Sequence, residues 1–165
     1  GANTCAFGRS ALSANTTANY NNAFGVVALT ANTTGTLNNA FGFEALNANI
    51  TGTNNSAFGH RALLLNTGNH NAAFGVGVIQ NNTSGAQNSA FGNYALLTNT
   101  TASDNSAFGY AALIANTTGS HNSALGTQAP HANTTPPNNS AFGHRTLYTN
   151  TPDAHNTPAD TYARA

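Results

Sequence analysis

A phrase of about 17 residues recurs along the chain and constrains its fold more than any other feature. The triplet Ala-Phe-Gly begins at positions 6, 23, 40, 57, 73, 90, 107 and 141, and Ala-Leu-Gly begins at position 124. Every step between copies is 17 residues long except the step of 16 from Ala57 to Ala73. This period is too short for helical-hairpin repeats, which need about 30 residues or more. It fits one coil of a β-solenoid, with two short strands and two turns in each coil.

Alignment of the copies produces columns of like residues. Because stacked coils lie about 4.8 Å apart, each residue sits on its equivalent in the next coil. We expect the phenylalanine column to form a continuous core stack, with a column of leucine or isoleucine beside it. The members of this expected core stack are Phe7, Phe24, Phe41, Phe58, Phe74, Phe91, Phe108, Leu125 and Phe142.

The residues on either side of each phenylalanine add two expectations. A strand of period 2 cannot point both the alanine and the following phenylalanine inward. With phenylalanine inside, the alanine column forms a flat, uncharged outer strip that suits close approach by another chain. A bulge that turns both residues inward is the alternative. The glycine after the phenylalanine predicts a tight bend with positive φ or no room for a side chain.

These patterns predict an all-β fold, a β-solenoid (parallel β-helix or β-roll) of nine coils of about 17 residues. We expect residues 1–151 to form the repeat array and residues 152–165 to form an irregular tail. All five prolines lie between positions 130 and 158, where they can stop strand addition. The tail is therefore expected to be a cap, a linker or a docking arm. A helical fold is disfavoured because Gly, Asn and Thr recur every few residues.

An asparagine stands nine residues after the alanine in every copy. Seven members form the N-x-[ST] glycosylation pattern, whereas Asn66 and Asn150 keep the asparagine without it. This persistence favours a structural ladder of stacked, hydrogen-bonded amides. Glycosylation of a subset is the alternative, although sugars rooted every ~4.8 Å would collide. The seven are Asn15, Asn32, Asn49, Asn82, Asn99, Asn116 and Asn133, and copies outside this column begin at Asn54, Asn81 and Asn138.

Two variable positions follow the glycine of each copy. Most of the charged residues of the repeat array fall there, so we expect this edge to face solvent. It is either a recognition rim or an ordinary solvated turn. The candidate rim residues are Arg9, Glu44, His60, Arg61, Tyr94, Tyr110, His144 and Arg145.

The composition argues against several classes of function. Only 5% of residues are charged, and the formal net charge is zero, so the clustered Lys and Arg that nucleic acids and anionic membrane surfaces require are missing. No apolar run is long enough to insert into a membrane. A single cysteine, Cys5, excludes an intrachain disulfide, and we expect a buried thiol.

Candidates for metal binding and catalysis are few. His60 and His144 share a column but lie five coils apart, too far to bind one metal. No serine, histidine and aspartate recur as a set, and no two acids are placed as an acid–base pair. We therefore expect no enzymatic activity, no metal and no cofactor.

The phrase N-S-A-F-G-x-x-A-L, at residues 88–96 and 105–113, resembles the head repeats of trimeric autotransporter adhesins. It is also similar to repeats of phage tail fibres and bacterial surface fibre proteins. The resemblance covers residues 4–151 and implies a left-handed β-roll exposed at a surface. It also implies a role in adhesion or scaffolding, often as a trimer.

We therefore expect an extracellular or cell-surface structural protein. Its coils would stack into a homo-oligomer or filament, because an uncapped end opposite a differently shaped end permits head-to-tail polymerisation. One alternative is an adhesin that binds glycans or proteins through the rim. Another is an ice-binding solenoid that uses the column Thr16, Thr33, Thr67, Thr83, Thr100, Thr117 and Thr134.

Overall fold

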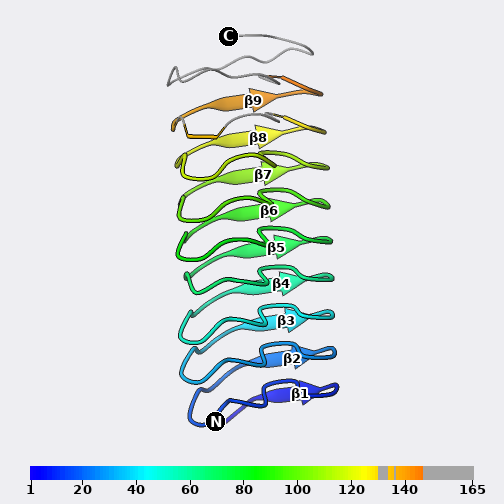
Figure 1. The fold of residues 1–165 in the computed structure, drawn as a ribbon, viewed down its shortest axis with the longest axis vertical. Coiled ribbons are helices and arrows are strands. Elements are labelled where there is room, and N and C mark those ends of the chain that lie inside the picture. Colours follow the sequence, from blue (N-terminus) through cyan, green and yellow to red (C-terminus); the bar gives the residue numbers. More distant parts are fainter. Residues whose placement is uncertain (130–133, 136, 147–165) are drawn as a thin grey trace.

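The chain folds into a stack of coils with its N-terminus at one end (Figure 1). The structure is a computed structural model, and it describes residues 1–129, 134–135 and 137–146. The predicted all-β solenoid is confirmed, and no helix occurs in these residues. The expected tail at 152–165, together with Asn133 and Asn150, lies outside them.

Each coil contributes one three-residue strand to a single sheet. The strands pair in parallel, in chain order, and in register, so that the Ala-Phe pair of one coil lies on that of the next. The strands are β1 (Cys5–Phe7), β2 (Asn22–Phe24), β3 (Asn39–Phe41), β4 (Ser56–Phe58), β5 (Ala72–Phe74), β6 (Ser89–Phe91), β7 (Ser106–Phe108), β8 (Ser123–Leu125) and β9 (Ser140–Phe142).

The return half of the coil is a series of turns rather than the predicted second strand. Two of its positions have left-handed backbone, as at Val27 (φ 53°) and Leu29 (φ 49°), and their equivalents in most described coils share it. A strand requires φ near −120°, so these positions interrupt any extended segment. The turns still bond between coils, as the Leu12 N–H does to the Ala28 carbonyl.

The core has the opposite orientation to the one predicted. The alanines of β2 to β9, such as Ala40 and Ala90, are buried, whereas Phe91 and Phe108 are each 38% exposed. The buried leucine and isoleucine column of the return half packs with these alanines. Because one leucine already fills the thin interior in each layer, no space remains there for a phenyl ring.

The prediction of a phenylalanine core was therefore wrong, and so was the prediction of an outward alanine strip. The bulge that would turn both residues inward is absent from the described strands, because alanine alone is buried in β2 to β9 and no residue is buried in β1. The residues reassigned from the core to the outer face are Phe7, Phe24, Phe41, Phe58, Phe74, Phe91, Phe108, Leu125 and Phe142.

The prediction for the glycine after each phenylalanine is confirmed. Its φ lies between 119° and 145° in the nine coils, a region that residues with a side chain rarely adopt. The coils also approach closely there, because a Cβ added at Gly42 would collide with the carbonyl oxygen of Gly59. The glycine column therefore permits both the bend and the coil spacing.

Replacement of Gly42 by alanine should lower the free energy of unfolding by about 3 kcal/mol or more, because strain and the collision add. Gly77→Ala is the matched control. Gly77 has φ 61°, and its added Cβ would meet side-chain atoms of Tyr94 and Gln80 at 3.0–3.2 Å, so a loss of about 1 kcal/mol is expected. Urea unfolding followed by circular dichroism measures both changes. Equal losses would contradict the account of coil spacing.

Candidate functional site

A ladder of buried asparagine side chains runs along one edge of the coils. Asn82 shows the bonding: its Nδ2 donates to Asn66 Oδ1 at 2.6 Å and to the Gly85 carbonyl oxygen at 2.7 Å. Its Oδ1 accepts from Asn99 Nδ2 at 2.8 Å. The predicted ladder is thus confirmed in the described coils. Its fully buried members are Asn32, Asn49, Asn66, Asn82, Asn99 and Asn116.

A second asparagine ladder lies two residues before the strand alanine and was missed in the sequence. The Asn38 backbone N–H donates to Asn21 Oδ1 at 2.9 Å, and Asn38 Nδ2 donates to the Gly52 carbonyl oxygen at 2.8 Å. From Asn21 to Asn88 each amide thus joins the start of the strand to the turn that follows the first ladder. The signal was an asparagine at this position in eight copies: Asn21, Asn38, Asn55, Asn71, Asn88, Asn105, Asn122 and Asn139.

The first ladder is interrupted at the coil that is one residue short. The missing residue falls in the turn Asn66-Thr67-Gly68, where other coils carry Asn-Thr-Thr-Gly or a close variant. Asn66 Nδ2 donates to the Gly68 carbonyl oxygen at 2.9 Å. Asn49 Oδ1, one coil below, is buried and has no partner among the described residues. A single deletion therefore leaves one unsatisfied acceptor in the interior.

The same amides bear on the alternative of glycosylation. Nδ2 is the atom that would carry an N-linked sugar, and at Asn32, Asn82 and Asn99 it already donates two hydrogen bonds without any exposed surface. The structure thus favours the structural role for these residues. Outside the ladder, Asn54 and Asn138 are exposed, and a sugar there would leave the ladder intact.

The candidate rim forms two local clusters rather than one site. Arg61 Nε lies 2.6 Å from Glu44 Oε2, and the His60 ring stacks on Phe43 with centroids 5.4 Å apart. Such an exposed ion pair contributes at most about 1 kcal/mol. The second cluster is an edge-to-face contact whose ring centroids lie 6.1 Å apart, between Tyr94 and Tyr110.

The remaining rim residues are not brought into these clusters. Arg9 and His144 are exposed, and Arg145 Nε donates to Gln128 Oε1 at 2.9 Å. The rim contacts shown here all join neighbouring coils. A role in recognition remains a prediction.

A second exposed and variable column was missed in the sequence. It lies three residues before the strand alanine, on the other side of the strand from the rim. Its residues have φ near 58–60°, and within it His121 Nε2 lies 3.7 Å from Asp104 Oδ2. The outer face of the strands is thus bordered by variable residues on both sides. The column contains Tyr20, Leu37, Asn54, His70, Gln87, Asp104, His121 and Asn138.

The threonine column proposed for ice binding lies on a turn, and its described hydroxyls bond within the stack. Thr67 Oγ1 donates to the Thr83 carbonyl oxygen at 2.6 Å, and Thr83 Oγ1 donates to the Thr100 carbonyl oxygen at 3.0 Å. Thr100 and Thr117 repeat the pattern. These donors are occupied by the next coil, which disfavours an ordered array of bound water.

The outward phenylalanines form a strip along the sheet, which we call the phenylalanine strip (Phe7, Phe24, Phe41, Phe58, Phe74, Phe91, Phe108, Leu125 and Phe142). From Phe24 to Phe108 successive rings are nearly parallel, with centroids 4.6–5.1 Å apart. The other outward column of the strands holds Ser, Asn, Ala and Cys5. Cys5 is exposed, so the expected buried thiol was wrong.

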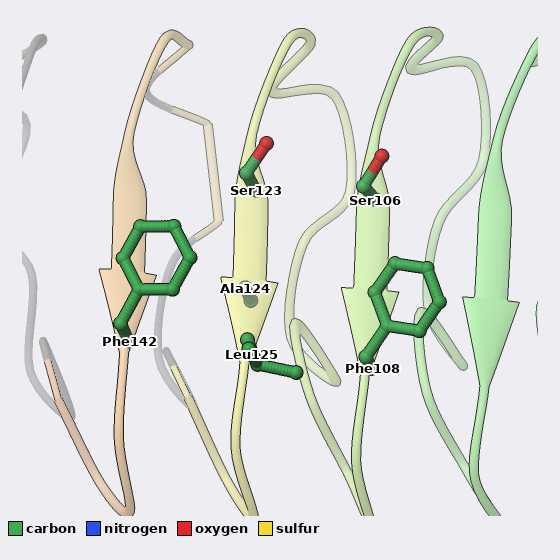
Figure 2. Close-up of a pocket in the computed structure, with 6 residues that line it drawn as sticks. All are labelled: Ser106, Phe108, Ser123, Ala124, Leu125 and Phe142. Atoms are coloured by element: carbon green, nitrogen blue, oxygen red, sulfur yellow. The ribbon is translucent and has the colours of Figure 1, made fainter.

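The strip is hollowed where leucine replaces phenylalanine. Phe108, Leu125 and Phe142 project from the same side of neighbouring strands, with the smaller Leu125 between the two rings (Figure 2). The hollow has a volume of about 270 Å³ and is also lined by Ser106, Ser123 and Ala124. It is open and apolar, and it contains no group suited to acid–base or metal chemistry.

Metal and membrane features are absent from the described part of the chain. No group of three or more His, Cys, Asp or Glu residues is placed to hold a metal ion. No helix among these residues could cross a membrane. Comparisons of the chain with protein families, with curated proteins and with solved structures found no match.

Restoration of the missing turn residue should stabilise the fold. Insertion of a threonine between Thr67 and Gly68 recreates the regular turn, so Asn66 Nδ2 can donate to Asn49 Oδ1. We expect a gain of about 1 kcal/mol in the free energy of unfolding, the net value of one buried hydrogen bond. The control insertion, between Ser84 and Gly85, lengthens a regular coil and should destabilise the fold. The urea concentration at the midpoint of unfolding measures both changes. A lower midpoint in both variants would contradict the view that the coil at Asn66 lacks one turn residue.

The bonding of the ladder can be tested by one isosteric change. Asn82→Asp removes both donors and places a carboxylate beside two oxygen acceptors, so it should cost about 3 kcal/mol or more at neutral pH. Asn81→Asp makes the same change at the adjacent, half-buried residue outside the ladder and should cost less than about 1 kcal/mol. Thermal unfolding compares the two, and similar midpoints would argue against the ladder as a stabilising element.

Proposed function

We propose that this chain is a structural subunit of an extracellular fibre in which copies stack end to end. The observation that carries the proposal is that successive described coils are joined by one repeated set of bonds. A coil of the same kind from another copy would be joined to the stack by the same set.

Three donors show the repeated set. Gly25 N–H and Val27 N–H donate to carbonyl oxygens of the first coil, and the same two bonds recur in the coils that follow. Asn32 Nδ2 donates to Asn15 Oδ1 at 3.3 Å, a bond that recurs in most described coils. A parallel edge with such donors is a template for further strands.

The way in which the interior is stabilised supports the same proposal. The sheet bonds, both asparagine ladders and the ring stack all run between coils, so a coil is stabilised by its neighbours rather than by itself. An end-to-end contact between two copies would repeat an interface that occurs eight times between the nine strands of the described residues. The extracellular location rests on the resemblance to adhesin head repeats and surface fibres.

The proposal is tested by blocking the first coil. The unmodified protein should form continuous filaments in electron micrographs at near-neutral pH. A globular domain fused to Gly1 through two residues should prevent them, because Gly1 lies at the end of the stack (Figure 1). The same domain on a 30-residue Gly/Ser linker, which spans about 30 Å, should leave filaments intact.

Two results would count against end-to-end stacking. One is an unmodified protein that stays as discrete rods at every concentration. The other is a short-linker fusion that forms filaments as readily as the long-linker fusion.

A further inference from the structure

We propose that the phenylalanine strip is a lateral interface on which a second copy of this chain packs, strip against strip. This interface lies on the side of the solenoid, whereas the proposed fibre is formed by contacts between the ends of copies. Lateral packing is therefore possible whether or not the copies also stack end to end.

The strip is as large as the largest apolar patches of typical monomeric proteins. Phe91 and Phe108 are 38% exposed, Phe142 is 47% exposed, Leu125 53% and Phe7 74%, and the other members are half-buried. With about 200 Å² for a phenylalanine side chain, the strip exposes on the order of 600 Å² of contiguous apolar surface per copy. Patches larger than a few hundred Å² on monomeric proteins mark interaction sites.

A second copy accounts for this area. Two strips in contact would bury about 1,200 Å² in total, which reaches the range of specific protein interfaces. The polar groups of a polar or charged partner would lose their hydrogen bonds to water on binding here, because the phenyl rings cannot replace those bonds.

The chemistry of the face also suits self-association. No charged side chain lies in either outward column of β1 to β9, so two copies can meet without burying an unpaired charge, which interfaces avoid at their centre. The same neutrality gives a charged partner nothing to recognise. The rings repeat every 4.6–5.1 Å, and another copy has the same repeat, so contacts made at one coil recur at the next.

The hollow at Leu125 would fix the register in which the two strips pair. A regular strip could pair equally well in registers shifted by whole coils. The hollow of about 270 Å³ between Phe108 and Phe142 interrupts that regularity and has room for a ring from the facing strip. A pair of strips is therefore best packed in the register that fills it.

Charge placed on the strip provides the test without removing any phenylalanine. The double variant Ser89→Glu, Ser106→Glu puts two carboxylates on the outer face of β6 and β7, where a second copy would bury them. The matched control is Thr101→Glu, Thr118→Glu. It adds the same charge to the same two coils, at exposed turn positions outside the strip.

Lateral pairing changes particle width, whereas end-to-end stacking changes particle length, so one set of electron micrographs separates the two. We expect double-width particles for the unmodified protein and for the turn variant at about 10 µM under reducing conditions. The strip variant should be of single width and should retain the far-ultraviolet circular dichroism of the fold. Sedimentation should show at least a tenfold higher dissociation constant for its lateral pairing.

Three outcomes would overturn the proposal. The first is an unmodified protein of single width at concentrations up to about 100 µM. The second is a strip variant and a turn variant of equal width. The third is a single-width protein that binds insoluble cellulose or phosphatidylcholine vesicles through the strip, which would assign this face to a polysaccharide or to a lipid surface.

Discussion

In-register stacking at the spacing of a parallel sheet is the constraint on which the rest of this structure depends. Each residue has its own equivalent about 4.8 Å above and below it, so a residue type is acceptable only if it packs well against itself. Phenylalanine meets this condition with parallel rings, and asparagine meets it because an amide both donates and accepts. Glycine meets it where the backbones of adjacent coils nearly touch. The residue types that recur in columns of the sequence are therefore those that pack well against copies of themselves.

The same constraint explains why so few residues are charged. A column of lysine or of glutamate would repel itself at every coil. The rim shows the permitted arrangement, because Arg61 lies on Glu44 and the next coil has Gly77 at the same position. Arg145 likewise lies on the neutral Gln128. Low charge therefore follows from the architecture and is not by itself a sign of function.

The period predicted the solenoid because repetition is visible without knowledge of which face is buried. The direction of phenylalanine could not be predicted in the same way, since hydrophobicity places the largest apolar residue inside. The available volume decides the matter instead, and Leu46 with Ala40 already fills the interior of a coil. The ladder at Asn82 was recognisable because the asparagine persisted without the glycosylation pattern. The ladder at Asn38 is harder to recognise, because its asparagine belongs to the phrase Asn-Ser-Ala-Phe-Gly and its close variants, which also form the strand.

The two proposed contacts differ in how they scale with the length of an assembly. End-to-end stacking would use directional hydrogen bonds of the kind that join coils within the chain, such as the bond from Gly25 N–H to the Phe7 carbonyl oxygen, and the number of these bonds at one contact would be the same for one chain as for a long fibre. The strip offers apolar area, and this grows with every coil added. Because linked contacts along two fibres reinforce one another, lateral pairing that would be modest between single chains would become strong between stacked ones. End contacts would thus determine the direction of growth, and the strip would determine the thickness.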